Sequence, residues 1–316
     1  MQPIHLNRLA MAAALFAAAA AAPAFAQSSV TVYGRLNTSI ENQKSGNADA
    51  KWIEQNNSSR LGFRGTEDIG GGLKAGFTIE HGFHSDDGLA NSSTTFWNRR
   101  SEVNLTLSSL GTVRLGKFFS EAYFATADYV SMHNHDTGTS SDALYAYVAN
   151  DNNKVAWHSP TFSGATVDLA RSFGEGATNA TYDAAVNWDG GPLHVGAGYS
   201  KNDADNQFAV RGLYEMGQFT FGGYLQRDKN AAGSRTNFRL SGMYTMDATE
   251  FHLNFGKAGD RGNIANSDAK QFTAAVNYNL SKRTKVYAFY TKLDDNTAGL
   301  YGGDFRSVAF GVRHNF

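Results

Sequence analysis

The chain ends in the stretch Ser307-Val308-Ala309-Phe310-Gly311-Val312-Arg313-His314-Asn315-Phe316, which alternates bulky apolar residues with small or polar ones. Successive side chains leave opposite faces of a β-strand, so the bulky residues point one way and the small or polar residues point the other. Segments of this kind, separated by turn residues, recur from residue 27 onward. They are the signature of a transmembrane β-barrel with lipid on one face and water on the other. We therefore expect residues 27–316 to form one all-β barrel domain.

Residues 1–26 have the features of a secretory signal peptide. Arg8 supplies a positive start, an apolar run follows from Ala10 to Ala22, and Ala24-Phe25-Ala26 gives the small-x-small pattern of a cleavage site. The alternative is a membrane anchor, but the run is much shorter than the roughly 20 residues that a spanning helix needs. We expect cleavage after Ala26 and export of the remainder.

Composition after the signal favours closely packed strands and excludes several classes of protein. The chain has 33 Gly, 22 Phe and 14 Tyr but only 4 Pro, which suits twisted strands with aromatic girdles at the two lipid headgroup levels. No run of 18 apolar residues follows Ala26, which excludes a helical membrane protein. Without Arg8, 27 Lys and Arg face 29 Asp and Glu, so net charge predicts no nucleic-acid partner. There is no Cys, which excludes disulfides.

Alternation and turn residues together predict sixteen strands. They lie near residues 29–40, 58–68, 73–83, 96–108, 112–119, 153–160, 164–173, 181–189, 192–200, 207–216, 218–228, 236–246, 249–257, 270–280, 284–293 and 304–316. Short turns alternate with longer loops, among them 41–57, 84–95, 258–269 and 294–303. An even strand count leaves both termini on one side of the membrane, which we expect to be the periplasmic side. A soluble β-sandwich could share the composition but would not need sixteen similar segments.

One connection, residues 120–152, lacks a sustained period of two and is unusually long. Long irregular segments in compact folds are usually functional. The alternative is an exposed loop without a fixed position. Its aromatic residues argue that it packs against another part of the protein: Tyr123, Phe124, Tyr129, Tyr145 and Tyr147.

Several ordered segments resemble the trimeric general-diffusion porins of β-proteobacteria, a family of Gram-negative outer-membrane porins. The longest is Ser58-Ser59-Arg60-Leu61-Gly62-Phe63-Arg64-Gly65-Thr66-Glu67-Asp68-Ile69-Gly70-Gly71-Gly72-Leu73-Lys74-Ala75-Gly76-Phe77. The others are residues 29–34, 111–117, 159–164, 280–284 and 311–316. All six occur in family order over the whole of 27–316, which makes the resemblance specific.

The resemblance implies a sixteen-stranded barrel in the bacterial outer membrane, a homotrimer, and a third external loop folded into the lumen. It also implies passive diffusion of ions and small hydrophilic solutes through a water-filled channel. Terminal Phe316 would be an assembly signal read by the outer-membrane insertion machinery; its alternative role is apolar packing.

Strand parity predicts which side chains line such a pore. Arginine on the lipid face costs about 2–4 kcal/mol at the bilayer midplane, so an arginine within a strand is expected to face water. Parity assigns a basic wall of inward arginines, namely Arg35, Arg60, Arg64, Arg100 and Arg114. Glu80 and Glu102 share the inward parity, whereas Arg99 has the lipid-facing parity and receives no pore role.

In similar porins, basic residues at the positions of Arg60 and Arg100 face acids on the inserted loop at the constriction. The candidate loop acids here are Glu121, Asp128, Asp136, Asp142 and Asp151. Charges at such close quarters select ions. Relatives carry a further arginine near the loop end, where this chain reads Asp151-Asn152-Asn153-Lys154. We therefore expect only a moderate anion preference.

Other function classes find less support in the residues. An outer-membrane barrel lipase or protease would need a positioned nucleophile and base, but no Gly-x-Ser-x-Gly elbow occurs. A structural barrel would lack a conducting lumen. His133-Asn134-His135 could ligate a metal, although two histidines in a polar loop are usually solvated. We predict no catalytic residue, no metal and no cofactor. The predicted partners are two further copies of the chain, membrane lipid, the insertion machinery, and small hydrophilic solutes and anions.

Overall fold

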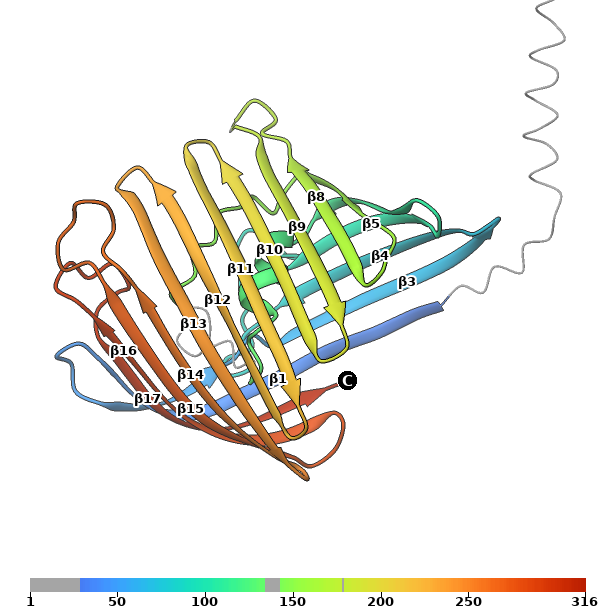
Figure 1. Cartoon of the computed structure of the whole chain (residues 1–316). Helices are drawn as coiled ribbons and strands as arrows, with labels where there is room; N and C mark the ends of the chain where they lie inside the picture. The colour runs from blue at the N-terminus through green and yellow to red at the C-terminus, as the bar shows by residue number, and fades with distance from the viewer. Residues whose placement is uncertain (1–28, 134–142, 178) are drawn as a thin grey trace, which may run out of the picture.

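The structure, a computed structural model, describes residues 29–133, 143–177 and 179–316. Within these ranges the chain is mostly β-strand, and the strands wrap around a common interior (Figure 1). The predicted signal 1–26 and the candidate acids Asp136 and Asp142 lie outside the described residues. No described helix is long and apolar enough to cross a membrane.

Seventeen strand segments form one sheet in which every pair is antiparallel. A short α-helix, α2 (Glu121–Tyr123), and a π-helical turn, η1 (Phe124–Asp128), lie between the sixth and seventh segments. The strands are β1 (Ser29–Ser45), β2 (Lys51–Asn56), β3 (Arg60–Gly70), β4 (Leu73–Gly82), β5 (Arg100–Leu107), β6 (Gly111–Lys117), β7 (Lys154–His158), β8 (Ala165–Ser172), β9 (Thr181–Gly190), β10 (Leu193–Asn202), β11 (Asp205–Met216), β12 (Phe219–Asn230), β13 (Gly233–Met246), β14 (Thr249–Ala258), β15 (Ala269–Asn279), β16 (Thr284–Asp295) and β17 (Phe305–Asn315).

The sheet closes into a barrel with sixteen strand positions. Along one edge, β1 pairs with β17 from Arg35 opposite Asn315 to Ser45 opposite Phe305. Along its other edge, β1 pairs with β3 through residues 29–35 and with β2 through residues 38–43. β2 and β3 are therefore two halves of one interrupted strand. The seventeen segments thus confirm the sixteen predicted strands and their antiparallel closure.

The two faces of the wall differ as alternation predicts. Along β1, the polar residues of one parity are buried while Leu36 and Ile40, of the other parity, are 45% and 59% exposed. The buried set is Arg35, Asn37, Ser39 and Glu41. A lipid environment accounts for this division, because it tolerates apolar side chains on the outside and requires every strand edge to be paired.

The two ends of the barrel also differ. At one end the connections are short, such as residues 71–72, 191–192, 217–218 and 247–248. The other end carries the long segments 83–99, 118–153, 259–268 and 296–304, together with two tight turns. On the outer wall, next to the short turns, the ring of Tyr244 stacks on Phe219 at 4.8 Å and lies 6.3 Å from Phe251. Such a row of aromatic rings is typical of the headgroup level.

The prediction of a long loop over residues 41–57 is wrong. Residues 41–57 were expected to be irregular, but β1 continues to Ser45 and β2 returns from Lys51 to Asn56. This hairpin lies at the long-loop end. Its outer face there includes polar residues such as Asn42 and Lys44, so the lipid-driven alternation that marks the other strands is missing from its sequence.

The closing seam involves the last residue. The amide of Gly34 donates to the carbonyl of Phe316 at 3.0 Å, and the Phe316 amide donates back at 3.1 Å. A Cβ on Gly34 would lie 2.5 Å from the Phe316 ring and 2.5 Å from the Arg60 carbonyl oxygen. Glycine at position 34 is therefore required for the terminal ring to lie against the seam.

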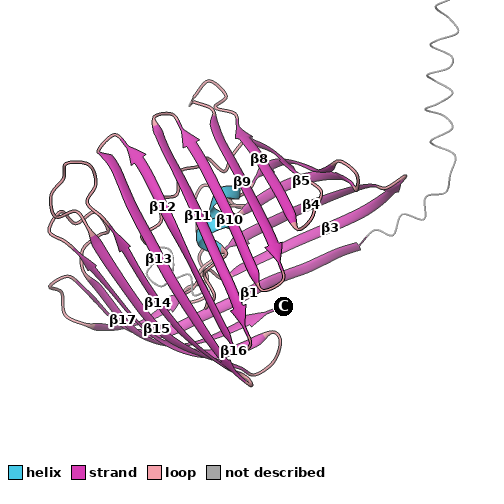
Figure 2. Cartoon of the chain, viewed as in Figure 1, coloured by secondary structure: helices cyan, strands magenta, loops and turns pink. Residues whose placement is uncertain are grey.

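The segment from 118 to 153, hereafter the inner loop, lies inside the barrel in its described parts. Figure 2 shows α2 and η1 within the ring of strands. Both contact β9 and β10, and η1 also contacts β11 and β12. Farther along, Leu144 packs against Ala258, Ala269 and Leu293 on the inward side of β14, β15 and β16. For the described residues, these contacts exclude the alternative of a loose external loop and place the segment in the lumen.

Candidate functional site

Asp183 on β9 holds the start of α2 against the wall. Ser120 caps the helix by accepting from the Tyr123 amide at 3.1 Å. The Asp183 carboxylate accepts from the amides of Glu121 at 2.6 Å and Ala122 at 3.0 Å. Because the first amides of a helix have no partner within it, a carboxylate at this position both satisfies them and complements the local dipole.

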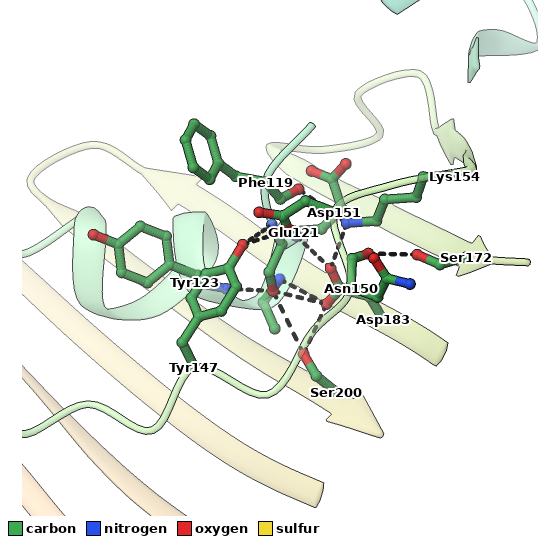
Figure 3. Close-up of polar contacts among 12 residues, drawn as sticks. Phe119, Glu121, Tyr123, Tyr147, Asn150, Asp151, Lys154, Ser172, Asp183 and Ser200 are labelled. Carbon is green, nitrogen blue, oxygen red and sulfur yellow. Dashed lines mark hydrogen bonds and ion pairs between the residues drawn. The ribbon is translucent and has the colours of Figure 1, made fainter. Parts of the chain in front are cut away.

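Lys154, the first residue of β7, completes this anchor (Figure 3). Its ammonium lies 3.3 Å from the Asp183 carboxylate and donates to the Phe119 carbonyl at 3.0 Å. Both side chains of the ion pair are only 1% exposed. Ser200 donates to the same carboxylate at 3.0 Å. Residues from β7, β9 and β10 thus fix the start of the inner loop.

The rest of the described inner loop is fixed by contacts of its backbone with the wall. A Cβ on Gly198 would meet the Ala122 Cα at 2.6 Å, so the absence of a side chain there allows α2 to approach β10. Arg211 donates to the Ala125 carbonyl at 2.9 Å and lies over the Tyr129 ring at 3.4 Å. Gln226 exchanges hydrogen bonds of 2.8 and 3.0 Å with the Ala146 backbone. The inner loop therefore covers the β9–β12 side of the lumen.

The opposite side of the lumen carries the predicted arginines. Arg60 and Arg64 on β3 pair with Gly82 and Thr78 on β4, and Arg100 on β5 pairs with Glu80 on β4. All of these residues have the inward parity. Arg114 on β6 lies opposite Asn104. The Arg64 guanidinium is 5.1 Å from the centre of the Tyr33 ring. Arg35 has the predicted inward parity, but it is only 2% exposed. Solutes in the lumen therefore cannot reach its side chain.

The parity-based placement of Arg99 is wrong. Its Nε donates to Glu80 at 2.6 Å, and its guanidinium lies 5.2 Å from the centre of the Phe119 ring, at the start of the inner loop. Both partners are inside the barrel. Arg99 precedes the first residue of β5, so the two-residue alternation of that strand does not govern its direction. We include Arg99 with Arg60, Arg64, Arg100 and Arg114 in what we call the basic wall.

Carboxylates pair with the basic wall and reduce its charge. Glu80 lies 3.9 Å from Arg60 in addition to its contact with Arg99. Glu102 lies 3.8 Å from Arg100 and 2.7 Å from Arg114. Two of these four contacts are longer than a good hydrogen bond, so their charges are only loosely matched.

Glu121 is the predicted loop acid that meets the basic wall. Its carboxylate accepts from Arg114 at 2.8 Å and is largely buried. Burial raises the pKa of Glu121, and the nearby carboxylate of Asp168 adds to the rise while Arg114 opposes it. Glu121 therefore becomes neutral at a higher pH than an ordinary glutamate.

The other described loop acids lie elsewhere. Asp128 ends η1, on the side that packs against β9–β12. Asp151 accepts from the Tyr147 hydroxyl at 2.7 Å, and burial raises the pKa of its carboxyl. Asp136 and Asp142 are outside the described residues. Asp183 and Lys154 were missed as site residues, because nothing in the local sequence indicates that β9 binds a helix start some sixty residues earlier.

His133 was considered as a metal ligand. It is buried and its ring lies 5.7 Å from His252 on β14; His135 is outside the described residues. Within the described ranges, His84, Asp86 and Asp87 form the group whose ligand atoms are close enough to hold an ion. That group is in the loop after β4, where Asp86 and Asp87 are exposed.

Comparison with known proteins gives agreement over nearly the whole chain. The family model described as Gram-negative porin matches residues 12–298. Outer membrane porin protein 32 of Delftia acidovorans is 31% identical, over 96% of this chain and 98% of that protein. The anion-selective porin from Comamonas acidovorans superposes with a TM-score of 0.78 at 27% identity, over 92% of this chain and 100% of that one. The trimer form of OmpT from Vibrio cholerae superposes with a TM-score of 0.69 over 92% of this chain and 99% of that one, but at 18% identity it shows the fold alone.

Proposed function

This chain belongs to the Gram-negative porin family, and from that premise we propose that its channel has a moderate preference for anions, set where the basic wall faces the inner loop. Its relatives are outer membrane porins, so the protein is a pore of the bacterial outer membrane. Diffusion through a water-filled barrel needs no energy source and no catalytic group.

The observation that carries the anion preference is a charge excess. The basic wall has five arginines, of which Arg60, Arg99, Arg100 and Arg114 share the three carboxylates of Glu80, Glu102 and Glu121. The fifth, Arg64, lies over the Tyr33 ring. A cleft with a surplus of one sign and low-dielectric walls raises the local concentration of the opposite ion. Because most of the arginines are paired, we expect the preference to be moderate. The anion-selective relative is consistent with this proposal.

The geometry also explains why the preference should depend on salt. Screening acts over about 8 Å at physiological ionic strength and over about 3 Å at 1 M. An anion crossing the lumen beside the basic wall would feel these charges through water rather than by direct contact. We expect the ratio of anion to cation permeability to fall as salt concentration rises.

Planar bilayers test the proposal. The wild-type protein should give stable ohmic steps, and in a salt gradient its zero-current potential should have the sign of anion preference. Replacing both Arg60 and Arg100 by glutamine should move that potential toward cation preference. Arg227→Gln is the control, because Arg227 has the outward parity of β12 and bonds to Thr236. An unchanged potential in the double variant would mean that these arginines do not control the narrow section.

We also propose that the functional unit is a homotrimer. The outward apolar side chains of β1 and β17 include Val32, Leu36, Phe310 and Val312, each between 45% and 58% exposed. A patch of this kind, next to the seam between β1 and β17, is suited to contact between copies as well as to lipid. Light scattering of the detergent complex should give three times the chain mass; a monomer would contradict the proposal.

Phe316 is proposed as the assembly signal in addition to its role in the seam. Its ring is 41% exposed on the outer face, where another protein can reach it before closure. Deleting Phe316 should reduce outer-membrane insertion in cells more than it reduces unassisted refolding into detergent. Equal losses in both assays would leave only the packing role.

A further inference from the structure

An aromatic pocket lies on the inner loop, beside the contacts that fix the start of the loop to the wall. Phe119, Tyr123, Tyr145, Tyr147 and Asp151 line a cavity of about 330 Å³. All five come from the two described arms of one loop, and Figure 3 labels every one of them except Tyr145. Tyr147 is 41% exposed, so its ring can be reached from solvent.

The rings of this pocket are set at steep angles to one another. The Tyr123 ring lies 5.4 Å from Tyr147 at 66° and 5.6 Å from Tyr145 at 62°. Rings at such angles present both faces and edges to the space between them. Rings stacked in parallel would cover each other's faces. Their edge-to-face contacts also fix the shape of the pocket before any ligand arrives.

A carboxylate adds negative charge to the pocket. The Tyr147 hydroxyl donates to Asp151 at 2.7 Å and accepts from the Ser120 amide at 2.8 Å, so both pocket residues are held in place. The neighbouring lysines have other partners: Lys154 pairs with Asp183 at 3.3 Å, and Lys117 donates to Asn152 at 2.9 Å. Part of the Asp151 charge therefore remains available to a ligand.

We propose that this pocket binds small organic cations whose charge is carried by an alkylated ammonium group. Aromatic faces are electronegative and attract such cations, and the attraction is strongest where the cation is weakly hydrated. The carboxylate acts in the same direction, and both features repel an anion. The guanidinium of Arg99 already lies 5.2 Å from the centre of the Phe119 ring, so the ligand shares that ring with a fixed cation, and the tyrosine rings and Asp151 supply most of the attraction. The pocket lies inside the barrel, so the ligand is a solute of the lumen rather than a lipid.

Choline is a suitable probe, with 3,3-dimethyl-1-butanol as its uncharged counterpart of the same shape. Single-channel currents of the wild-type pore are recorded in potassium chloride while each compound is titrated. The pH is 8, because burial raises the pKa of Asp151 and a higher pH favours its ionised form. Choline should cause concentration-dependent reductions of the current, and the neutral alcohol should cause far weaker ones.

Two variants locate the effect. Asp151→Asn keeps an oxygen that accepts from Tyr147 but removes the charge, and it should raise the half-blocking choline concentration about fivefold to tenfold, as loss of one partly screened charge at contact distance implies. Phe119→Leu keeps apolar bulk but removes a ring face and should also raise it. Asp203→Asn is the control, because Asp203 is an exposed turn residue outside the pocket and asparagine tolerates its positive φ. A stable open-channel current step without choline shows that each variant still forms its pore.

Three results would overturn the proposal. Equal block by choline and the alcohol would mean that charge is not recognised. Wild-type half-blocking concentrations in both Asp151→Asn and Phe119→Leu would place any choline site elsewhere. Block by sodium benzoate in preference to choline would show a pocket for ring-bearing anions instead. A wild-type protein without conductance would instead contradict the pore itself, and binding of choline to that protein would then be measured by calorimetry.

Discussion

Replacing Asp183 by asparagine should release the start of the inner loop from the barrel wall. The carboxylate accepts from two backbone amides of α2 and from Ser200, and it is the partner of the Lys154 ammonium. Asparagine retains one acceptor oxygen but carries no charge. The substitution therefore leaves the buried ammonium of Lys154 without its counter-charge.

The size of the effect follows from burial. Both side chains of the ion pair are 1% exposed, so water cannot replace the lost partner without movement of the loop. Removing one member of a buried pair typically costs about 3–5 kcal/mol, whereas replacing both by apolar residues is often nearly neutral. Asp183→Asn should thus be strongly disruptive, and Asp183→Asn combined with Lys154→Met should recover much of the loss. The remaining deficit reflects the Phe119 carbonyl, which loses its donor, and one of the Glu121 and Ala122 amides, which would face the asparagine NH2 group.

Two assays separate this local effect from general damage. In bilayers, Asp183→Asn should give open-channel current with larger fluctuations, and limited proteolysis should cut the chain within 118–153. The double variant should show smaller current fluctuations and slower proteolysis than Asp183→Asn, and Asp203→Asn should match the wild type in both assays. Quiet, protease-resistant channels from Asp183→Asn would refute the reasoning. A double variant no better than the single one would show that the ion pair is not the source of the effect.

Three further outcomes follow from the same geometry. Arg99→Gln should shift the zero-current potential toward cation preference, as a member of the basic wall does; no shift would return Arg99 to the lipid-facing role that parity gave it. Lowering the pH to mildly acid values should increase anion preference, because the raised pKa of Glu121 lets it become neutral and leaves Arg114 paired with Glu102 alone. Glu121→Gln should lose this pH dependence, and a pH dependence that survives would assign it to another group. Gly34→Ala should destabilise the seam by about 1–3 kcal/mol, seen as a lower melting temperature by circular dichroism, whereas an unchanged melting temperature would mean that Phe316 moves aside freely.

The barrel was predictable because lipid imposes a rule on every spanning strand. Apolar residues must recur at every second position of the outer face, and this is visible in the sequence without any knowledge of contacts. The predicted strands therefore agree closely with β3 to β17. The rule does not act beyond the membrane, which is why the hairpin of β1 and β2 was taken for a loop.

Strand parity also predicted which side chains point into the lumen, provided that the residue lay inside a strand. Arg60, Arg64, Arg100 and Arg114 have the predicted inward direction, whereas Arg99 does not because it precedes β5. The anchor between Asp183 and the inner loop could not be predicted, since it joins residues about sixty positions apart through backbone amides that any sequence would supply. Only the closed barrel brings them together.

The central claim is that solutes pass the narrowest section between the basic wall and the inner loop. Because the chain contains no Cys, a single introduced thiol can be modified without background. We would compare Arg100→Cys with Val103→Cys, two positions on β5 of which Val103 is outward and 51% exposed. A bulky, negatively charged thiosulfonate reagent should reduce the single-channel current of Arg100→Cys in one irreversible step and leave Val103→Cys unchanged. An undiminished current after confirmed modification of Arg100→Cys would contradict the account.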